Sequence, residues 1–160
     1  MRRRSAGPLC LLLLGAATVI GCGDELSKED YTTQVRDAIQ PVVETSQALA
    51  TDAQGATSVE DLSAPLEEAE STYSETASTL EEIDPPDEVE DLHERLVTAH
   101  ESIAEAAGDA AEAAAEGDET GVMPFQEAGT AYQEELTSLE TDYQEQEYDF
   151  GGAPAPAPTP

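Results

Sequence analysis

Basic residues are almost missing from this sequence of 160 residues. Six lysines and arginines stand against 36 aspartates and glutamates, which gives a formal net charge of −30. All of the acids lie after residue 21, whereas three of the six basic residues lie before it. Such a chain repels phosphate, so the composition excludes nucleic-acid binding and electrostatic attachment to an anionic membrane surface.

The residue patterns of common catalytic sites are missing as well. The sequence has no Gly-x-Ser-x-Gly motif and no glycine-rich phosphate loop. Its two histidines lie on one predicted helix, which does not make a catalytic triad. Asn is absent, and with it any N-glycosylation site. We therefore expect a protein that is not an enzyme and that has no bound cofactor.

The first 22 residues have the form of an export signal. A basic segment, residues 1–5, precedes an apolar run of 12 residues over 9–20. That run is too short to cross about 30 Å of hydrocarbon and has the length of a signal-peptide core. Val19-Ile20-Gly21-Cys22 follows the order aliphatic, aliphatic, small, Cys, and so resembles the lipobox of bacterial lipoproteins.

The lipobox resemblance implies that the chain is cut between Gly21 and Cys22 and that the Cys22 thiol receives a diacylglycerol. Two or three acyl chains hold a protein at a membrane far more firmly than one. The expected location is the extracytoplasmic face of the cell membrane; an uncleaved anchor or an ordinary secretory signal is the alternative. Cleavage removes Cys10, so we expect neither a disulfide nor a cysteine metal site.

Four helical patterns follow the leader, and no segment has the strict alternation of a β-strand. We expect a linker over 22–26, helices over about 27–52, 59–83, 85–116 and 122–148, and a disordered Pro/Ala tail over 151–160. Short connections make successive helices antiparallel. The predicted fold is all-α, an up-down-up-down four-helix bundle, with a three-helix bundle and a loose first helix as the alternative.

Local signals fix several of these boundaries. Ser27 and Asp30 resemble a capping box at the start of the first helix. Pro41 is expected to kink that helix or break its hydrogen-bond ladder. Asp84, just before Pro85 and Pro86, is expected to cap the third helix.

The second and third helices carry apolar stripes that predict their buried faces. The predicted stripe positions are Val59, Leu62, Leu66, Ala69, Tyr73, Ala77, Leu80 and Ile83 in the second helix, and Val89, Leu92, Leu96, Ala99, Ile103, Ala106 and Ala110 in the third. The Ala-rich end of the third helix buries little area and is expected to be thin and soft. Tyr31, Tyr73, Tyr132 and Tyr143 fall on the apolar stripes and are expected in the core, with their hydroxyls at its rim.

His93 and His100 lie seven residues apart, on one face beside the predicted stripe of the third helix. Glu90 and His93 form a Glu-x-x-His pattern, but a di-iron bundle needs two such pairs and further glutamates. We interpret both histidines as boundary residues that balance nearby acids, with a surface metal site as the alternative. Arg36 and Arg95 are expected to pair with acids.

Acidic clusters could bind Ca²⁺ loosely, but none has the loop pattern of a dedicated calcium site. These clusters are Glu67, Glu68 and Glu70; Glu81 and Glu82; and Asp87, Glu88, Glu90 and Asp91. We interpret them as a solvated face that keeps the protein soluble.

Several short motifs together resemble a group of small exported helical lipoproteins of actinobacteria. The motifs are the lipobox Cys22, Leu26-Ser27-Lys28-x-x-Tyr31, and Leu80-x-x-Ile83-x-Pro85-Pro86-x-Glu88 with His93 and Leu96 after it. The resemblance implies an architecture and a location, and no activity. Members of the group often have one Cys in the first helix and another near the C-terminus. Residues 39–40 and 148–151 of this chain have none, which implies a lost bridge.

These features predict a lipid-anchored, non-catalytic binding or interaction module that meets an envelope or secreted protein through a helix face. The alternative is an acidic lipoprotein that binds cations, either Ca²⁺ or a transition metal.

Charge repulsion within the mature chain gives a first testable prediction. Like charges oppose the compact state, and salt screens them over a Debye length of about 3 Å at 1 M. We expect the melting temperature to rise when NaCl or a divalent cation is added, as measured by circular dichroism. A melting temperature that is the same at low and high NaCl would contradict this.

Overall fold

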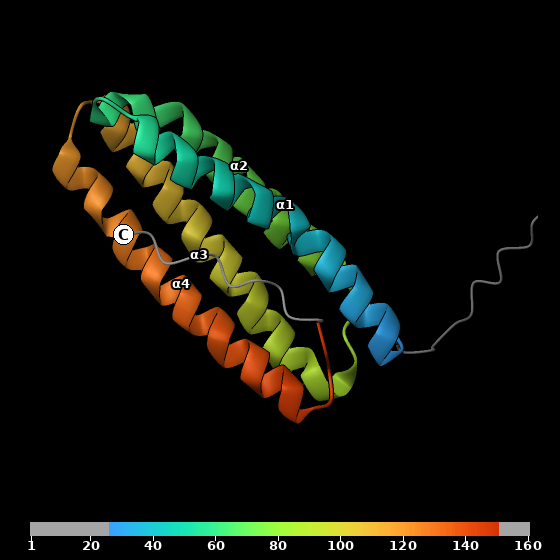
Figure 1. The fold of residues 1–160 in the computed structure, drawn as a ribbon. Helices are drawn as coiled ribbons and strands as arrows, with labels where there is room; N and C mark the ends of the chain where they lie inside the picture. The colour runs from blue at the N-terminus through green and yellow to red at the C-terminus, as the bar shows by residue number, and fades with distance from the viewer. Residues whose placement is uncertain (1–25, 151–160) are drawn as a thin grey trace, which may run out of the picture.

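The computed structural model describes residues 26–150, and all regular structure in that range is helical. The helices are α1 (Lys28–Gly55), α2 (Ser63–Glu81), α3 (Glu90–Ala115) and α4 (Glu119–Glu145), with 3-10 turns η1 (Val59–Leu62) and η2 (Asp87–Val89). In Figure 1 these helices lie side by side, and the chain reverses direction at each connection. The predicted four-helix architecture is confirmed. The leader with Gly21 and Cys22, most of the linker, and the tail lie outside the described residues.

The start of α1 follows the predicted cap. The Asp30 amide donates to Ser27 Oγ over 3.1 Å, and Ser27 Oγ donates to the Asp30 carboxylate over 2.7 Å. Pro41 does not end α1, which continues through it to Gly55, but proline has no N–H, so the hydrogen-bond ladder lacks one bond there, as expected. Pro41 is exposed, so water can satisfy the carbonyl that lacks a partner.

The third helix begins later than predicted, and Asp84 does not cap it. The N-cap of α3 is Val89, which follows the 3-10 turn η2. The reason is the paired prolines: a residue that precedes proline is kept out of the helical region, so Pro85 cannot open a helix when Pro86 follows. The turn after Pro86 places Val89 in the core, where it is 0 % exposed.

A glycine-based cap connects α3 to α4. Gly117 has φ 75°, its amide donates to the Ala114 carbonyl, and the Asp118 amide donates to the Ala113 carbonyl. This pair of bonds is a Schellman motif. Asp118 then caps α4 by accepting from the Thr120 amide, so α4 begins at Glu119, earlier than predicted.

The fourth helix also ends earlier than predicted, at Glu145. Glu147 has φ 64°, and the chain turns back toward the start of α1. Tyr148, only 1 % exposed, is thereby buried against Tyr31 and Tyr143. The segment after α4 is therefore part of the core.

The core has three layers along the bundle, which we number from the start of α1. Layer one contains Tyr31, Val35, Ala38, Leu80, Ile83, Val89, Leu96, Leu139, Tyr143 and Tyr148. Layer two contains Val42, Ala69, Tyr73, Ile103, Ala104, Ala107 and Tyr132. Layer three contains Leu66, Ala110, Ala111, Ala114 and Val122. Three of these last five side chains are alanine, so this end buries the least apolar area, as the composition of α3 predicted.

The helices do not close evenly around this core. α3 packs closely on both α2 and α4, and α1 packs on α2, but α1 and α4 do not approach each other closely. The space between α1 and α4 is an apolar groove, which we call the α1–α4 seam. Its floor is α3.

The three basic residues of the described region each join parts of the chain that are distant in sequence. Lys28 Nζ donates to the Gln146 carbonyl over 2.7 Å and lies 3.6 Å from a Glu88 carboxylate oxygen. Arg36 Nε donates to the Phe150 carbonyl over 3.1 Å, so its expected partner, an acid, is replaced by a backbone oxygen.

Arg95 pairs with acids as predicted. It contacts Glu135 at 2.9 Å and Asp142 at 2.7 Å, and so joins α3 to α4. These groups are part-exposed, so the pairs orient the helices more than they stabilise them.

No helix of the described residues is both long enough and apolar enough to cross a bilayer.

Two glycines of α4 give a matched pair of variants. A methyl group at Gly129 would meet no atom within 4 Å, whereas one at Gly121 would lie 2.6 Å from Ala113 Cβ. We expect Gly129→Ala to raise the free energy of unfolding by about 0.5–1 kcal/mol, because alanine restricts the unfolded chain. We expect Gly121→Ala to lower it by about 1–3 kcal/mol through overpacking. Urea denaturation measures both, and shifts of the same sign would contradict the close contact of α3 with α4.

Candidate functional site

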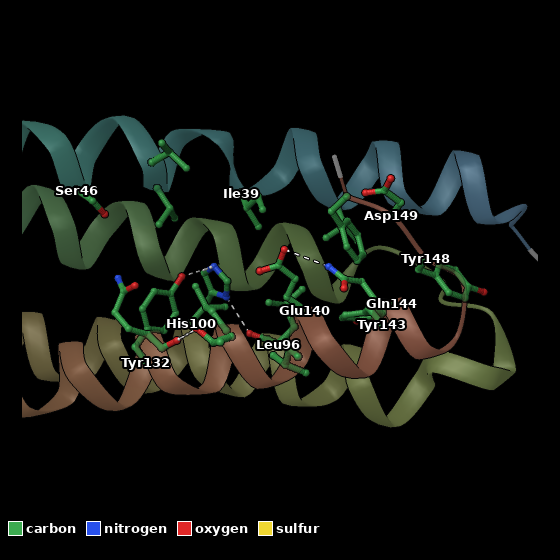
Figure 2. A pocket seen from close by; sticks show the side chains of 18 residues that line it. Ile39, Ser46, Leu96, His100, Tyr132, Glu140, Tyr143, Gln144, Tyr148 and Asp149 are labelled. Carbon is green, nitrogen blue, oxygen red and sulfur yellow. Dashed lines mark hydrogen bonds between the residues drawn. The ribbon is translucent and has the colours of Figure 1, made fainter. Parts of the chain in front are cut away.

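The α1–α4 seam is an apolar groove that runs along the bundle between its first and last helices. Figure 2 shows side chains from α1 and α4 facing each other across it, with Leu96 and His100 of α3 beneath. The lining consists of Val35, Ile39, Val42, Val43 and Ser46 of α1; Leu96 and His100 of α3; Tyr132, Gln133, Leu136, Thr137, Leu139, Glu140, Tyr143 and Gln144 of α4; and Tyr148, Asp149 and Phe150. Apolar side chains dominate the walls, and neutral polar ones occupy much of the rim.

The volume of the cavity in the seam limits the size of the group that can enter it. Its cavity has a volume of about 140 Å³. Pockets for drug-sized ligands are usually about 300–1,000 Å³, whereas a dry apolar cavity of about 150 Å³ accepts benzene. The deepest part of the seam therefore fits one ring-sized apolar group.

A histidine–tyrosine pair forms the floor of the seam at its middle. His100 is 1 % exposed, with Nδ1 2.8 Å from the Leu96 carbonyl and Nε2 3.0 Å from the Tyr132 hydroxyl. A carbonyl oxygen only accepts, so Nδ1 holds the proton and Nε2 accepts from Tyr132. Burial lowers the pKa of His100 below its ordinary value and raises the pKa of Tyr132. Both groups are neutral at neutral pH.

A second histidine–tyrosine network lies in layer one. His93 Nε2 donates to the Leu80 carbonyl over 2.9 Å, which leaves Nδ1 to accept from the Tyr31 hydroxyl at 3.0 Å. The Tyr31 oxygen then accepts from the Tyr143 hydroxyl at 2.8 Å. Burial lowers the pKa of His93, raises that of Tyr31 and raises that of Tyr143 to about 12. The chain of donors joins α1, α2, α3 and α4.

The interpretation of His93 and His100 as boundary residues is wrong, since both are core residues. The buried stripe of α3 lies one residue further along than predicted at every second position. Its positions are Val89, His93, Leu96, His100, Ile103, Ala107, Ala110 and Ala114. Leu92, Ala99 and Ala106 are only half-buried. Tyrosine hydroxyls make this register possible, because they satisfy the ring nitrogens in the core.

The predicted location of the tyrosines in the core is confirmed, but their hydroxyls are not at its rim. Those of Tyr31, Tyr132 and Tyr143 are buried and hydrogen-bonded within it. Tyr73 donates to or accepts from Ser46 on α1 at 3.0 Å. No buried side-chain nitrogen or oxygen of residues 26–150 lacks a hydrogen-bond partner.

The described residues offer no clustered metal ligands. No group of three or more His, Cys, Asp or Glu side chains within 26–150 could hold a metal ion. Both ring nitrogens of His93 and of His100 bond to protein atoms, so neither ring has a free nitrogen for the surface metal site that was the alternative.

The acidic clusters predicted from sequence lie on the outside of the bundle. Their carboxylates are exposed, as expected of a solvated face. Some of them come together only in the fold: Glu70, Glu81, Glu101 and Glu105 line a hollow between α2 and α3.

Sequence reasoning missed the seam. The apolar pair Val42-Val43 and the nearby Ile39 give α1 more apolar surface than packing on α2 requires, and that is the signal for it. Tyr148 and Phe150, at the end of the seam, gave no periodic signal because they follow α4.

Comparison with protein-family models, with curated proteins and with solved structures finds no match for this chain.

Burial of the two histidines predicts how stability depends on pH. Their pKa values are lower in the folded than in the unfolded chain, so below about pH 6.5 the unfolded chain binds more protons. The stability that neutral imidazole provides is present above that pH and is lost as pH falls below it. The loss approaches about 1.4 kcal/mol per pH unit for each histidine.

Urea denaturation at about pH 7.5, 6.5 and 5.5 measures this dependence. These two are the only histidines in the chain, so the double variant His93→Gln/His100→Gln is expected to be less stable at pH 7.5 but to lose the slope. An equal slope in the variant would show that other groups titrate.

Proposed function

We propose that this protein is a lipoprotein, held on the extracytoplasmic face of the membrane by lipid on Cys22, that binds an envelope or secreted protein through the α1–α4 seam. The observation that carries the proposal is the seam itself. A bundle that closes α1 on α2, α2 on α3 and α3 on α4 leaves an apolar groove open between its first and last helices. Apolar surface of this kind, rimmed by polar residues, is typical of an interaction site.

The leader supplies the other half of the proposal. The lipobox residues end six positions before α1 begins at Lys28. Six residues span at most about 20 Å, so an anchor at Cys22 would keep the bundle close to the membrane. The acidic surface is repelled by anionic headgroups over about 10 Å, and the seam would remain free to meet a partner.

The chemistry of the seam supports binding rather than catalysis. Its histidine is neutral and has both nitrogens bonded, to Leu96 and Tyr132. The Ser46 hydroxyl bonds to Tyr73 and lies next to no base. Nothing in the lining resembles an activated nucleophile.

The alternative role, loose cation binding, has the hollow between α2 and α3 in its favour. The glutamates that line it do not form a group that could hold a metal ion, so counterions would be held only diffusely. Calorimetry with Ca²⁺ is expected to show heats without saturation; saturable binding would favour the alternative.

The membrane anchor has a direct test. Mass spectrometry of the protein extracted from membranes is expected to show a chain that begins at Cys22 with a diacylglycerol attached. The Cys22→Ser variant has no thiol to acylate, so this protein is expected to be lost from the membrane fraction. An intact leader on a cytosolic protein would contradict the proposal.

The seam has its own test, by photo-crosslinking in intact cells. A crosslinker in place of Val43, on the wall of the seam, is expected to capture a discrete partner. A crosslinker in place of Ser78, exposed on α2, is the control and is expected to capture none. Equal capture at both positions would remove the seam as the binding surface.

A further inference from the structure

The charge around the α1–α4 seam indicates which sign of charge a partner protein would carry. This step rests on the proposed function. The only charged side chains in the lining are Glu140 and Asp149. Of the 36 acids in the chain, only Asp24 and Glu25 lie outside residues 26–150, so 34 acids face three basic residues in the described region. The field over the groove is negative and favours a cationic surface.

The basic residues do little to offset this field at the seam. Lys28 and Arg36 are engaged at the end of the bundle, with the Gln146 and Phe150 carbonyls. Arg95 is paired with Glu135 and Asp142 on the other side of α4. With three basic residues against 34 acids in residues 26–150, an anionic partner would meet net repulsion along the groove.

The two walls of the seam have the spacing of a helix-packing surface. Lining residues follow one another at intervals of four, three and four on both helices: Val35, Ile39, Val42 and Ser46 on α1, and Tyr132, Leu136, Leu139 and Tyr143 on α4. Most of them are already buried in the core, and the partly exposed ones that a partner could contact are Ile39, Ser46 and Leu136. A helix with an apolar stripe fits such a groove, as in other helix-in-groove complexes. The cavity of about 140 Å³ adds a place for one bulky anchor side chain at the centre.

We infer that the seam docks a basic amphipathic helix of a partner protein. The helix inserts one aromatic or other bulky apolar side chain into the cavity, and lysines or arginines beside its apolar stripe face Glu140, Asp149 and the negative field of the bundle. A drug-sized ligand is too large for the cavity, and the described chain has no sheet edge on which an extended peptide could add.

The test uses three fluorescent peptides of about 18 residues with the chain that begins at residue 22. The first is a basic amphipathic helix with a single Phe in its leucine stripe, the second has Glu in place of its Lys and Arg, and the third is a scrambled basic sequence. Anisotropy at physiological ionic strength is expected to show saturable binding of the first peptide at micromolar concentrations. The other two are expected to bind at least about tenfold more weakly.

Matched variants separate the seam from the general charge of the protein. Val43→Glu puts a carboxylate on the seam wall, and Gln126→Glu makes the same charge change at an exposed site elsewhere in the bundle. We expect Val43→Glu to lower the affinity for the basic peptide at least about tenfold. Gln126→Glu is expected to leave that affinity unchanged within about twofold. Leu136→Gln changes the other wall of the seam and is also expected to lower the affinity for the basic peptide. Circular dichroism checks that each variant is folded.

Each contrary outcome has a distinct meaning. Equal affinity for the scrambled peptide, or equal effects of Val43→Glu and Gln126→Glu, would overturn the inference in favour of diffuse electrostatics. A dimer in sedimentation that Val43→Glu dissociates would make a second copy the occupant. Peptide binding only after truncation at Phe150 would make residues 151–160 the occupant. Capture of a partner from Val43 in cells without peptide binding would leave the proposed function standing and remove this inference alone.

Discussion

Both nitrogens of an imidazole must find partners when the ring is buried, because an unbonded polar group in a core costs about 1–3 kcal/mol. α3 carries two such rings, His93 and His100, and their partners come from all four helices through Tyr31, Leu80, Tyr132 and the helix's own backbone. Apolar contacts tolerate a small shift of one helix along another at little cost in free energy, whereas a shift would break these hydrogen bonds. They fix how α1, α2 and α4 sit along α3.

Charge sets a second limit on the same bundle. Residues 26–150 contain three basic residues and 34 acids. Lys28 and Arg36 join α1 to the segment after α4, and Arg95 joins α3 to α4. None bridges the seam between α1 and α4 directly. The lining of the seam therefore carries net negative charge, from Glu140 and Asp149.

Much of the architecture is visible in the sequence. Ser27 capped its helix as predicted, the stripe from Leu66 to Ile83 was buried, and Gly117 ended α3. The errors have physical causes. Asp84 does not cap α3, because Pro86 keeps Pro85 out of the helical region. The buried stripe of α3 was misplaced because histidine was treated as a surface residue, and the sequence does not show that a buried tyrosine hydroxyl lies opposite it.

The sequence by itself determined the helical class, the order of the helices and the excess of negative charge, since periodicity, caps and composition are local properties. Only the tertiary structure decided which face of α3 is inside, where Tyr148 lies, and that α1 and α4 leave a groove between them. Those features depend on which side chains from distant helices meet, and no window along one helix contains that information.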